Sequence, residues 1–158
     1  MIEHYSHKIQ NAIQKELFKA NSSIKIAVAW FTNDLLFQPL LLKLDAGVSV
    51  ELILNKDDIN CSDDNEINFD EFVKAGGILR WNDTKQLMHE KFCIIDDKIV
   101  IYGSYNWTNK AEYTADTIDY LTRYSNNMIS MSPLQSIDIM PTEQNKDKLY
   151  RNYVYAGA

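Results

Sequence analysis

Long hydrophobic runs are missing from this chain, and cysteine is scarce. The longest apolar stretch, Ile24 to Phe31, is interrupted by Lys25 and is far too short to cross a bilayer. The first ten residues lack a charged segment followed by an apolar one, so we expect no secretory signal. The two cysteines, Cys61 and Cys93, form no metal-ligand cluster, and we expect them reduced, with a disulfide between them as the alternative. These features favour the cytoplasm.

An excess of basic residues, the usual mark of a nucleic-acid-binding surface, is missing as well. The formal net charge is −6, and residues 55–71 carry all of it, with seven acidic residues against one basic residue. The other 15 basic and 15 acidic residues cancel. An acidic protein attracts polyanions poorly, but a neutral body with one acidic loop is less hostile to phosphate than the net charge suggests. The length of 158 residues and the 46% hydrophobic content predict a single domain over residues 1–158.

Helices and strands alternate along the chain. Helical spacing predicts a helix over residues 4–20 and another over 33–45, with Pro39 at a kink or a late start of the second. Short helices are expected near 68–75 and after Asn106, and a further one over 142–155, while 125–141 is assigned only as loop. Apolar, β-branched segments predict strands at 24–31, 48–54, 78–81, 88–95, 98–102 and 117–122. This order predicts an α/β fold with a mixed central sheet flanked by helices.

The residues suited to chemistry lie between Met88 and Thr108. Residues two apart on a strand share a face, so His89 and Lys91 should project together. An imidazole can act as a nucleophile or carry a proton near neutral pH, and an ammonium neutralises an anionic phosphate oxygen. The pair is therefore a candidate site for phosphoryl chemistry.

A hairpin should bring a second group of residues to the same place. The link at Asp96 suits a tight turn, and a residue at such a corner usually serves the turn. The returning strand would place Ser104 and Asn106, two short neutral donors, near His89, while Gly103 would permit a close approach of backbone and ligand. No carboxylate cluster suited to Mg²⁺ or Ca²⁺ accompanies them, so we expect no metal and no cofactor.

This spacing resembles the H-x-K and G-S-x-N motif of the phospholipase D superfamily. The segment 24–33, IKIAVAWFTN, is also similar to the first core strand and following helix of that family. The resemblance covers residues 4–122 and points to the branch with a single motif, which includes small bacterial nucleases and mitochondrial cardiolipin-hydrolase-like endonucleases. Six positions spread over eighteen residues fall in register: His89, Lys91, Asp96, Gly103, Ser104 and Asn106.

The resemblance implies an α/β sandwich that forms a homodimer, so that two motifs meet at one site. One histidine attacks phosphorus and forms a phosphohistidine, and the other protonates the leaving oxygen and then activates water. One imidazole cannot easily act on both sides of an in-line displacement, and this chain has one such motif. The second imidazole is therefore expected from a second copy of the chain.

The sequence departs from the family after the G-S-x-N segment. The family commonly carries an Asn and a Glu there, and the Glu orients the catalytic histidine. The nearest carboxylate here is Asp116, one methylene shorter, which we take as a catalytic candidate in that role. His4 and His7 look like a metal pair one helical turn apart, but they lack a third ligand and are expected on a solvated surface. The three tryptophans are expected in the core or at the rim of the site.

Three functions fit these observations. A metal-independent nuclease is the first. A phospholipase acting on a lipid headgroup is the second, and it would need an apolar groove beside the site. The third is a non-catalytic dimeric module that binds phosphate or nucleic acid, which the Asp116 departure and the acidic charge keep open.

Overall fold

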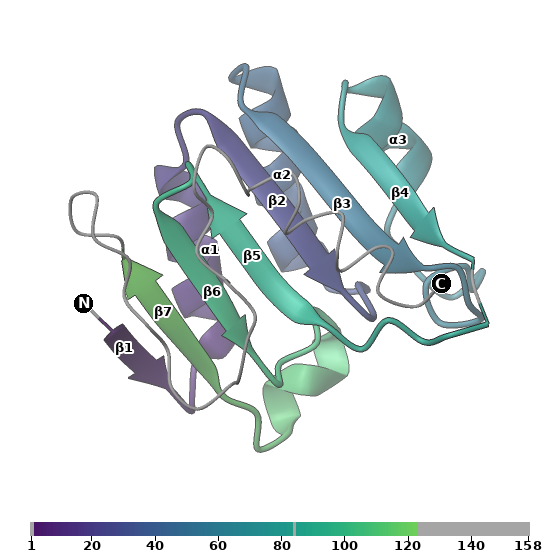
Figure 1. Ribbon diagram of the computed structural model, residues 1–158. Coiled ribbons are helices and arrows are strands. Elements are labelled where there is room, and N and C mark those ends of the chain that lie inside the picture. The colour runs from purple at the N-terminus through teal and green to yellow at the C-terminus, as the bar shows by residue number, and fades with distance from the viewer. Residues whose placement is uncertain (1, 84, 123–158) are drawn as a thin grey trace.

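The computed structural model describes residues 2–83 and 85–122, which form one seven-stranded sheet and its helices (Figure 1). The strand order is β1-β7-β6-β5-β2-β3-β4. The elements, in chain order, are β1 (Ile2–Tyr5), α1 (Ile9–Lys19), β2 (Ser23–Val28), α2 (Asp34–Asp45), β3 (Ser49–Asn55), α3 (Phe69–Lys74), β4 (Ile78–Asn82), β5 (Lys91–Ile95), β6 (Ile99–Gly103), the 3₁₀ helix η1 (Asn109–Tyr113) and β7 (Ile118–Thr122).

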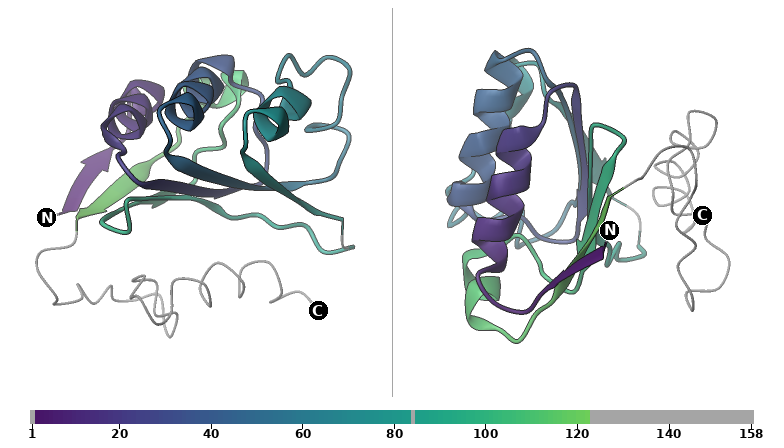
Figure 2. Two further views of the ribbon diagram at one scale, coloured as in Figure 1. Left: turned by 90° about the horizontal axis from the view of Figure 1, so that it is seen from above. Right: turned by 90° about the vertical axis from the view of Figure 1, so that its left-hand side faces the viewer.

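The sheet is mixed, because it contains both parallel and antiparallel strand pairs. β2, β3 and β4 are parallel and are joined through α2 and α3, whereas β2, β5, β6, β7 and β1 pair antiparallel. Within residues 2–83 and 85–122, α1, α2 and α3 all lie on one face of the sheet (Figure 2). The predicted α/β class with a mixed central sheet and flanking helices is confirmed.

The core lies between this helical layer and the sheet. Ile13 and Leu17 of α1 and Leu36 and Leu40 of α2 are fully buried, at the helical spacing that predicts both elements. Cys93 of β5 belongs to the same core, and burial raises the pKa of its thiol well above the ordinary value. Cys93 is therefore a packing residue, as its position in a buried strand indicates.

The first helix is shorter than the sequence predicts. Residues 2–5 form β1, which pairs with β7, and α1 begins only at Ile9, after Lys8 adopts a left-handed conformation with φ of 54°. The prediction of one helix over 4–20 was wrong for its first turn, because pairing with a strand more than a hundred residues away leaves no local signal. His4 and His7 therefore do not share a helix face, and the His4 Nδ1 lies 2.8 Å from Asp119 Oδ1.

Pro39 lies inside α2 without delaying its start. The helix begins at Asp34, with the Asn33 side chain accepting a hydrogen bond from the Leu36 N–H at its N-terminus. A proline cannot donate to the carbonyl four residues before it, which here is that of Leu35. The Gln14 side chain of α1 donates to this carbonyl at 2.9 Å. The neighbouring helix thus replaces the missing bond, and the late start was a wrong prediction.

The remaining expected elements differ only at their ends. β3, α3, β4, β6, η1 and β7 all lie within a residue or two of their predicted positions. The predicted loop over 125–141 and helix over 142–155 lie outside the described residues.

Candidate active site

His89 lies just before β5 and is exposed. The strand was expected from Met88, but it begins at Lys91, because the Asn55 side chain takes the backbone bonds of Met88. The Met88 N–H donates to Asn55 Oδ1 at 3.1 Å, and Asn55 Nδ2 donates to the Met88 carbonyl at 2.9 Å. His89 therefore stands in a loop fixed by a side chain, and the alternation of a strand does not set the direction of its imidazole.

Lys91 is the first residue of β5, and only 8% of it is exposed. Its Nζ donates a hydrogen bond to the His89 carbonyl at 2.8 Å. Desolvation lowers the pKa of Lys91, while the negative charges of Glu90 and Asp116 act to raise it. The ammonium is thus held beside the backbone of His89, and the Asp116 carboxylate lies close enough to act on its charge.

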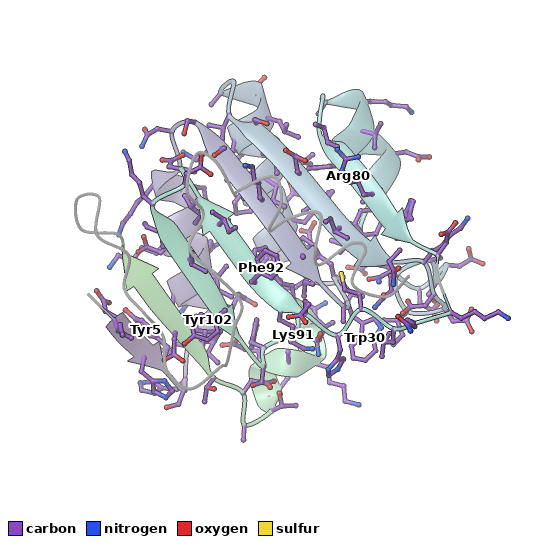
Figure 3. All side chains as sticks on the ribbon, in the orientation of Figure 1. Tyr5, Trp30, Arg80, Lys91, Phe92 and Tyr102 are labelled. Atoms are coloured by element: carbon purple, nitrogen blue, oxygen red, sulfur yellow. The ribbon has the colours of Figure 1, made fainter. Side chains whose placement is uncertain are left out.

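The G-S-x-N segment reaches the same end of the sheet. β6 runs antiparallel to β5, with Tyr102 opposite Phe92, so the residues after Gly103 return toward Lys91. The Trp107 N–H donates to the Trp30 carbonyl at 3.1 Å, which ties this segment to the loop after β2. Figure 3 shows Trp30 and Lys91 at one end of the sheet.

Ser104 and Asp116 form a hydrogen-bonded unit. The Ser104 hydroxyl donates to Asp116 Oδ1 at 2.8 Å and accepts from the Thr117 N–H at 3.1 Å. The Thr114 hydroxyl donates to the other carboxylate oxygen of Asp116. Among residues 2–83 and 85–122, no hydrogen bond joins Asp116 to His89. Within one chain, Asp116 therefore holds Ser104 and acts on the Lys91 charge, and its expected role in orienting an imidazole stays a prediction.

Asn106 carries an amide oxygen that is buried and has no hydrogen-bond partner in the described part of the chain. Buried polar atoms in native proteins are nearly always paired. Asn106 lies two residues after Ser104, in the segment that returns toward Lys91.

The packing of β6 against β7 requires a glycine at position 103. A Cβ at this position would lie 2.0 Å from the Thr117 carbonyl oxygen and 2.9 Å from the Ile118 Cα. The close approach that the structure shows at Gly103 is to the backbone of β7, and the expected approach of a ligand there stays a prediction. A larger residue would push β7 away and move the Ser104–Asp116 pair with it.

Asp96 lies at the opposite end of β5, at the corner of the hairpin. It and Asp97 both have φ of 53°, the left-handed conformation, in a tight turn that the Lys98 N–H closes by donating to the Ile95 carbonyl at 2.9 Å. The Asp96 carboxylate accepts hydrogen bonds from the backbone N–H groups of Asn21, Ser22 and Ser23. Desolvation acts to raise the pKa of Asp96, but these bonds outweigh it and lower the pKa to about 2. Asp96 thus fastens the hairpin to the loop between α1 and β2.

Replacing Asp96 with Asn should therefore lower stability more than chemistry. The depressed pKa means that the carboxylate stabilises the fold at pH values above its unfolded pKa and loses this effect as the pH falls toward 2. We expect a loss of roughly 1–2 kcal/mol at neutral pH, after allowing for solvent screening at this half-buried position. Chemical denaturation of wild type, Asp96→Asn and the matched control Asp97→Asn at several pH values measures it. A loss that does not shrink between pH 4 and pH 2 would contradict the assignment.

Three residues beside His89 carry no motif and were not predicted as site residues. Trp30 contacts the His89 ring edge-on, with 5.7 Å between ring centroids and 74° between planes. The Trp30 Nε1–H donates to Asp57 Oδ2 at 2.8 Å, and Asn55 holds Met88 as described above. The expected place of Trp30, core or rim, is confirmed, but Asp57 was read as part of a solvated acidic loop.

The described part of the chain contains no cluster of metal ligands and no helix suited to spanning a membrane. Residues 2–83 and 85–122 contain no group of three or more His, Cys, Asp or Glu side chains that could hold a metal ion. None of the helices in these ranges is long and apolar enough to cross a membrane.

The chain is similar to a known protein family and to several curated proteins. A family model described as cardiolipin synthase, PLD-like domain, matches residues 13–128. The mitochondrial cardiolipin hydrolase of Chlamydomonas reinhardtii is 34% identical over 95 residues, 60% of this chain and 41% of the relative. That of Mus musculus is 30% identical over 107 residues, 68% of this chain and 47% of the relative. The chain thus spans less than half the length of these two curated relatives.

Solved structures share the fold. Nuc, a phospholipase D family member from Salmonella typhimurium, has a TM-score of 0.69 at 18% identity, covering 77% of this chain and 81% of that one. NucT from Helicobacter pylori has a TM-score of 0.57 at 20% identity, covering 76% and 84%. Only one of the three histidines in the sequence, His89, begins an H-x-K triplet. From the matched family model, the relatives and the fold, the chain belongs to the phospholipase D-like family, in its branch with a single H-x-K motif.

Proposed function

We propose that this protein is a metal-independent phosphodiesterase, most simply a nuclease, which works through a phosphohistidine on His89. One observation carries the proposal. The His89 side chain is exposed, and the buried Lys91 ammonium is hydrogen-bonded to the backbone carbonyl of the same histidine. A nucleophile must be reachable by substrate, whereas a charge that stabilises a phosphate is more effective when it is partly desolvated.

The proposed reaction uses the residues at this end of the sheet together with a second imidazole. The His89 imidazole forms a bond to phosphorus as the ester oxygen leaves, and a second imidazole donates the proton that this oxygen takes up. The second imidazole then removes a proton from water, which attacks phosphorus and breaks the phosphorus–nitrogen bond. Lys91 neutralises the non-bridging oxygens, and Ser104 and Asn106 supply neutral hydrogen-bonding groups.

We place the second imidazole on a second copy of the chain. The sequence holds one H-x-K motif, and a two-fold axis that passes beside His89 would bring two of them together. The two free thiols, Cys61 and Cys93, fit the proposed location in the reducing cytoplasm.

Nucleic acid is the proposed substrate class because the surroundings of His89 are polar or aromatic. Trp30 contacts the His89 ring, and the charges of Glu90 and Lys91 act close to it. The Asp116 carboxylate, which holds Ser104, acts on the charge of Lys91. A phosphodiester in a nucleic-acid backbone needs such a lining, whereas an acyl chain needs an aliphatic groove. A phospholipid substrate is kept as the alternative, because the curated relatives are named mitochondrial cardiolipin hydrolases.

Incubation with single-stranded DNA, duplex DNA, RNA and cardiolipin vesicles tests the proposal, each with and without EDTA. We expect cleavage of at least one nucleic acid at an undiminished rate in EDTA, because the positive charge at the site comes from Lys91 rather than from a metal. Activity lost in EDTA and restored by Mg²⁺ would overturn the mechanism. Cleavage of cardiolipin alone would move the substrate class to lipid, and binding without cleavage would favour the non-catalytic module.

A further inference from the structure

The imidazole of His89 is held by packing rather than by hydrogen bonds. Within residues 2–83 and 85–122, neither ring nitrogen of His89 takes part in a hydrogen bond. Both nitrogens are thus available for chemistry. An exposed side chain without such a bond rotates freely unless another group confines it, and free rotation works against an in-line attack.

We propose that Trp30 and Asp57 are positioning residues for the His89 imidazole, an inference that rests on the proposed function. The Trp30 indole lies against the edge of the imidazole, with 5.7 Å between centroids and 74° between planes. This T-shaped arrangement is one of the preferred geometries of aromatic pairs. The indole itself is fixed, because its Nε1–H donates to Asp57 Oδ2 at 2.8 Å.

The two rings meet because one buried side chain fixes both backbones. Asn55, of which 3% is exposed, donates through Nδ2 to the carbonyls of Ala29 and Met88, the residues immediately before Trp30 and His89. Its Oδ1 accepts from the Met88 N–H at 3.1 Å. The amide of Asn55 thus acts as a bracket between the loop after β2 and the loop before β5.

Asp57 is fixed in turn by the loop that follows β3. Its Oδ1 accepts from the N–H groups of Ile59 and Asn60, at 3.1 Å and 3.0 Å. Asn60, of which 2% is exposed, returns to the Trp30 side by donating to the Ala29 carbonyl and accepting from the Phe31 N–H. The two oxygens of Asp57 therefore have separate tasks: Oδ1 holds the loop, and Oδ2 holds the indole.

This division of tasks supplies a test with a matched control. Asp57→Asn keeps an Oδ1 acceptor for the loop and places an amide NH₂ against the indole N–H, so it should release Trp30 while preserving the turn. Asp58→Asn makes the same charge change at an exposed neighbour. Trp30→Phe breaks the same hydrogen bond by removing the indole N–H. This variant replaces Asp57→Asn in the test if Asp57→Asn fails to fold.

Histidine-selective ¹³C labelling gives a readout that does not depend on catalysis. The sequence has three histidines, so the NMR spectrum should show three imidazoles, with His89 assigned from His89→Asn. Asp57→Asn and Trp30→Phe should shift or broaden the His89 resonances and leave those of His4 and His7 in place, and Asp58→Asn should change none. In turnover, both variants should lower kcat by about tenfold or more with KM nearly constant, since misplacement of a reacting group by about 1 Å can cost 10²-fold. The double variant should be little worse than either single one.

The outcomes separate this inference from the proposed function. His89 resonances and kcat that match wild type in both Asp57→Asn and Trp30→Phe would overturn the positioning role, even in an active enzyme. Shifted His89 resonances in a protein that cleaves no substrate would support the positioning role and contradict the proposed function. Equal effects of Asp57→Asn and Asp58→Asn would assign the effect to net charge and overturn the inference.

Discussion

Replacing His89 with Asn should abolish turnover and the covalent intermediate together. In the proposed mechanism the exposed imidazole attacks phosphorus, and an amide of similar size cannot replace it. The loss should reach the detection limit. The measurement is a turnover assay with the preferred substrate, together with an acid-labile, base-stable phosphoryl group sought on the protein.

Mixing adds a control for the proposed dimer. His89→Asn should fold as wild type, since the His89 ring makes no hydrogen bond to the described residues. An excess of this variant should lower the specific activity of added wild type, because each mixed dimer contains a single imidazole. Unchanged wild-type activity after subunit exchange would indicate that one chain suffices.

Replacing Lys91 with Ala should cause the second largest loss of activity. Deleting a comparable stabilising group from an enzyme lowers kcat by about 10²–10³-fold, and we expect a loss of this order. The ammonium is buried beside the His89 carbonyl and is the nearest described cation to that residue. Lys91→Met is the better variant for stability, because it retains most of the buried side-chain volume while removing the charge. The rate loss should appear in both variants and mainly in kcat, as expected of a group that acts on the transition state.

The pH dependence gives the same assignment a second test. Desolvation lowers the pKa of Lys91, so the charged form is lost at a lower pH than for an ordinary lysine, and the activity should fall on the alkaline side accordingly. The Asp116 carboxylate acts to raise that pKa, and Asp116→Asn should therefore move the alkaline fall to lower pH. An alkaline fall that stays in place in Asp116→Asn, or a Lys91→Met enzyme with wild-type kcat, would contradict the role of Lys91.

The motif and the central strands could be predicted from the sequence because both depend on local spacing. β2, β3, β5 and β6 are apolar and buried, and the hairpin corner at Asp96 follows from two residues that tolerate a left-handed backbone. Antiparallel return of β6 then brings the G-S-x-N segment to the end of the sheet where His89 lies. Fold class and motif thus required no tertiary information.

The support of His89 could not be predicted, because it is made of long-range side-chain bonds. Asn55 contacts Met88 across 33 residues, and Trp30 contacts Asp57 across 27. The sequence around Asn55 and Asp57 has no local pattern that distinguishes these two residues from residues of a solvated loop. β1 was missed for the same reason, since its partner β7 lies more than a hundred residues away. The role of Asp116 toward the imidazole stays a prediction, since its bonds within the described residues go to Ser104 and Thr114.

The most direct test of the proposed mechanism is to trap the intermediate on the wild-type enzyme. The protein is mixed with the substrate it cleaves fastest, denatured within a single turnover, digested at alkaline pH and analysed by mass spectrometry. We predict a phosphoryl-linked product fragment on the peptide that contains His89, on a ring nitrogen, absent from His89→Asn and formed equally in EDTA. An active enzyme that carries no phosphoryl group on His89, or carries it on another residue, would contradict the mechanism.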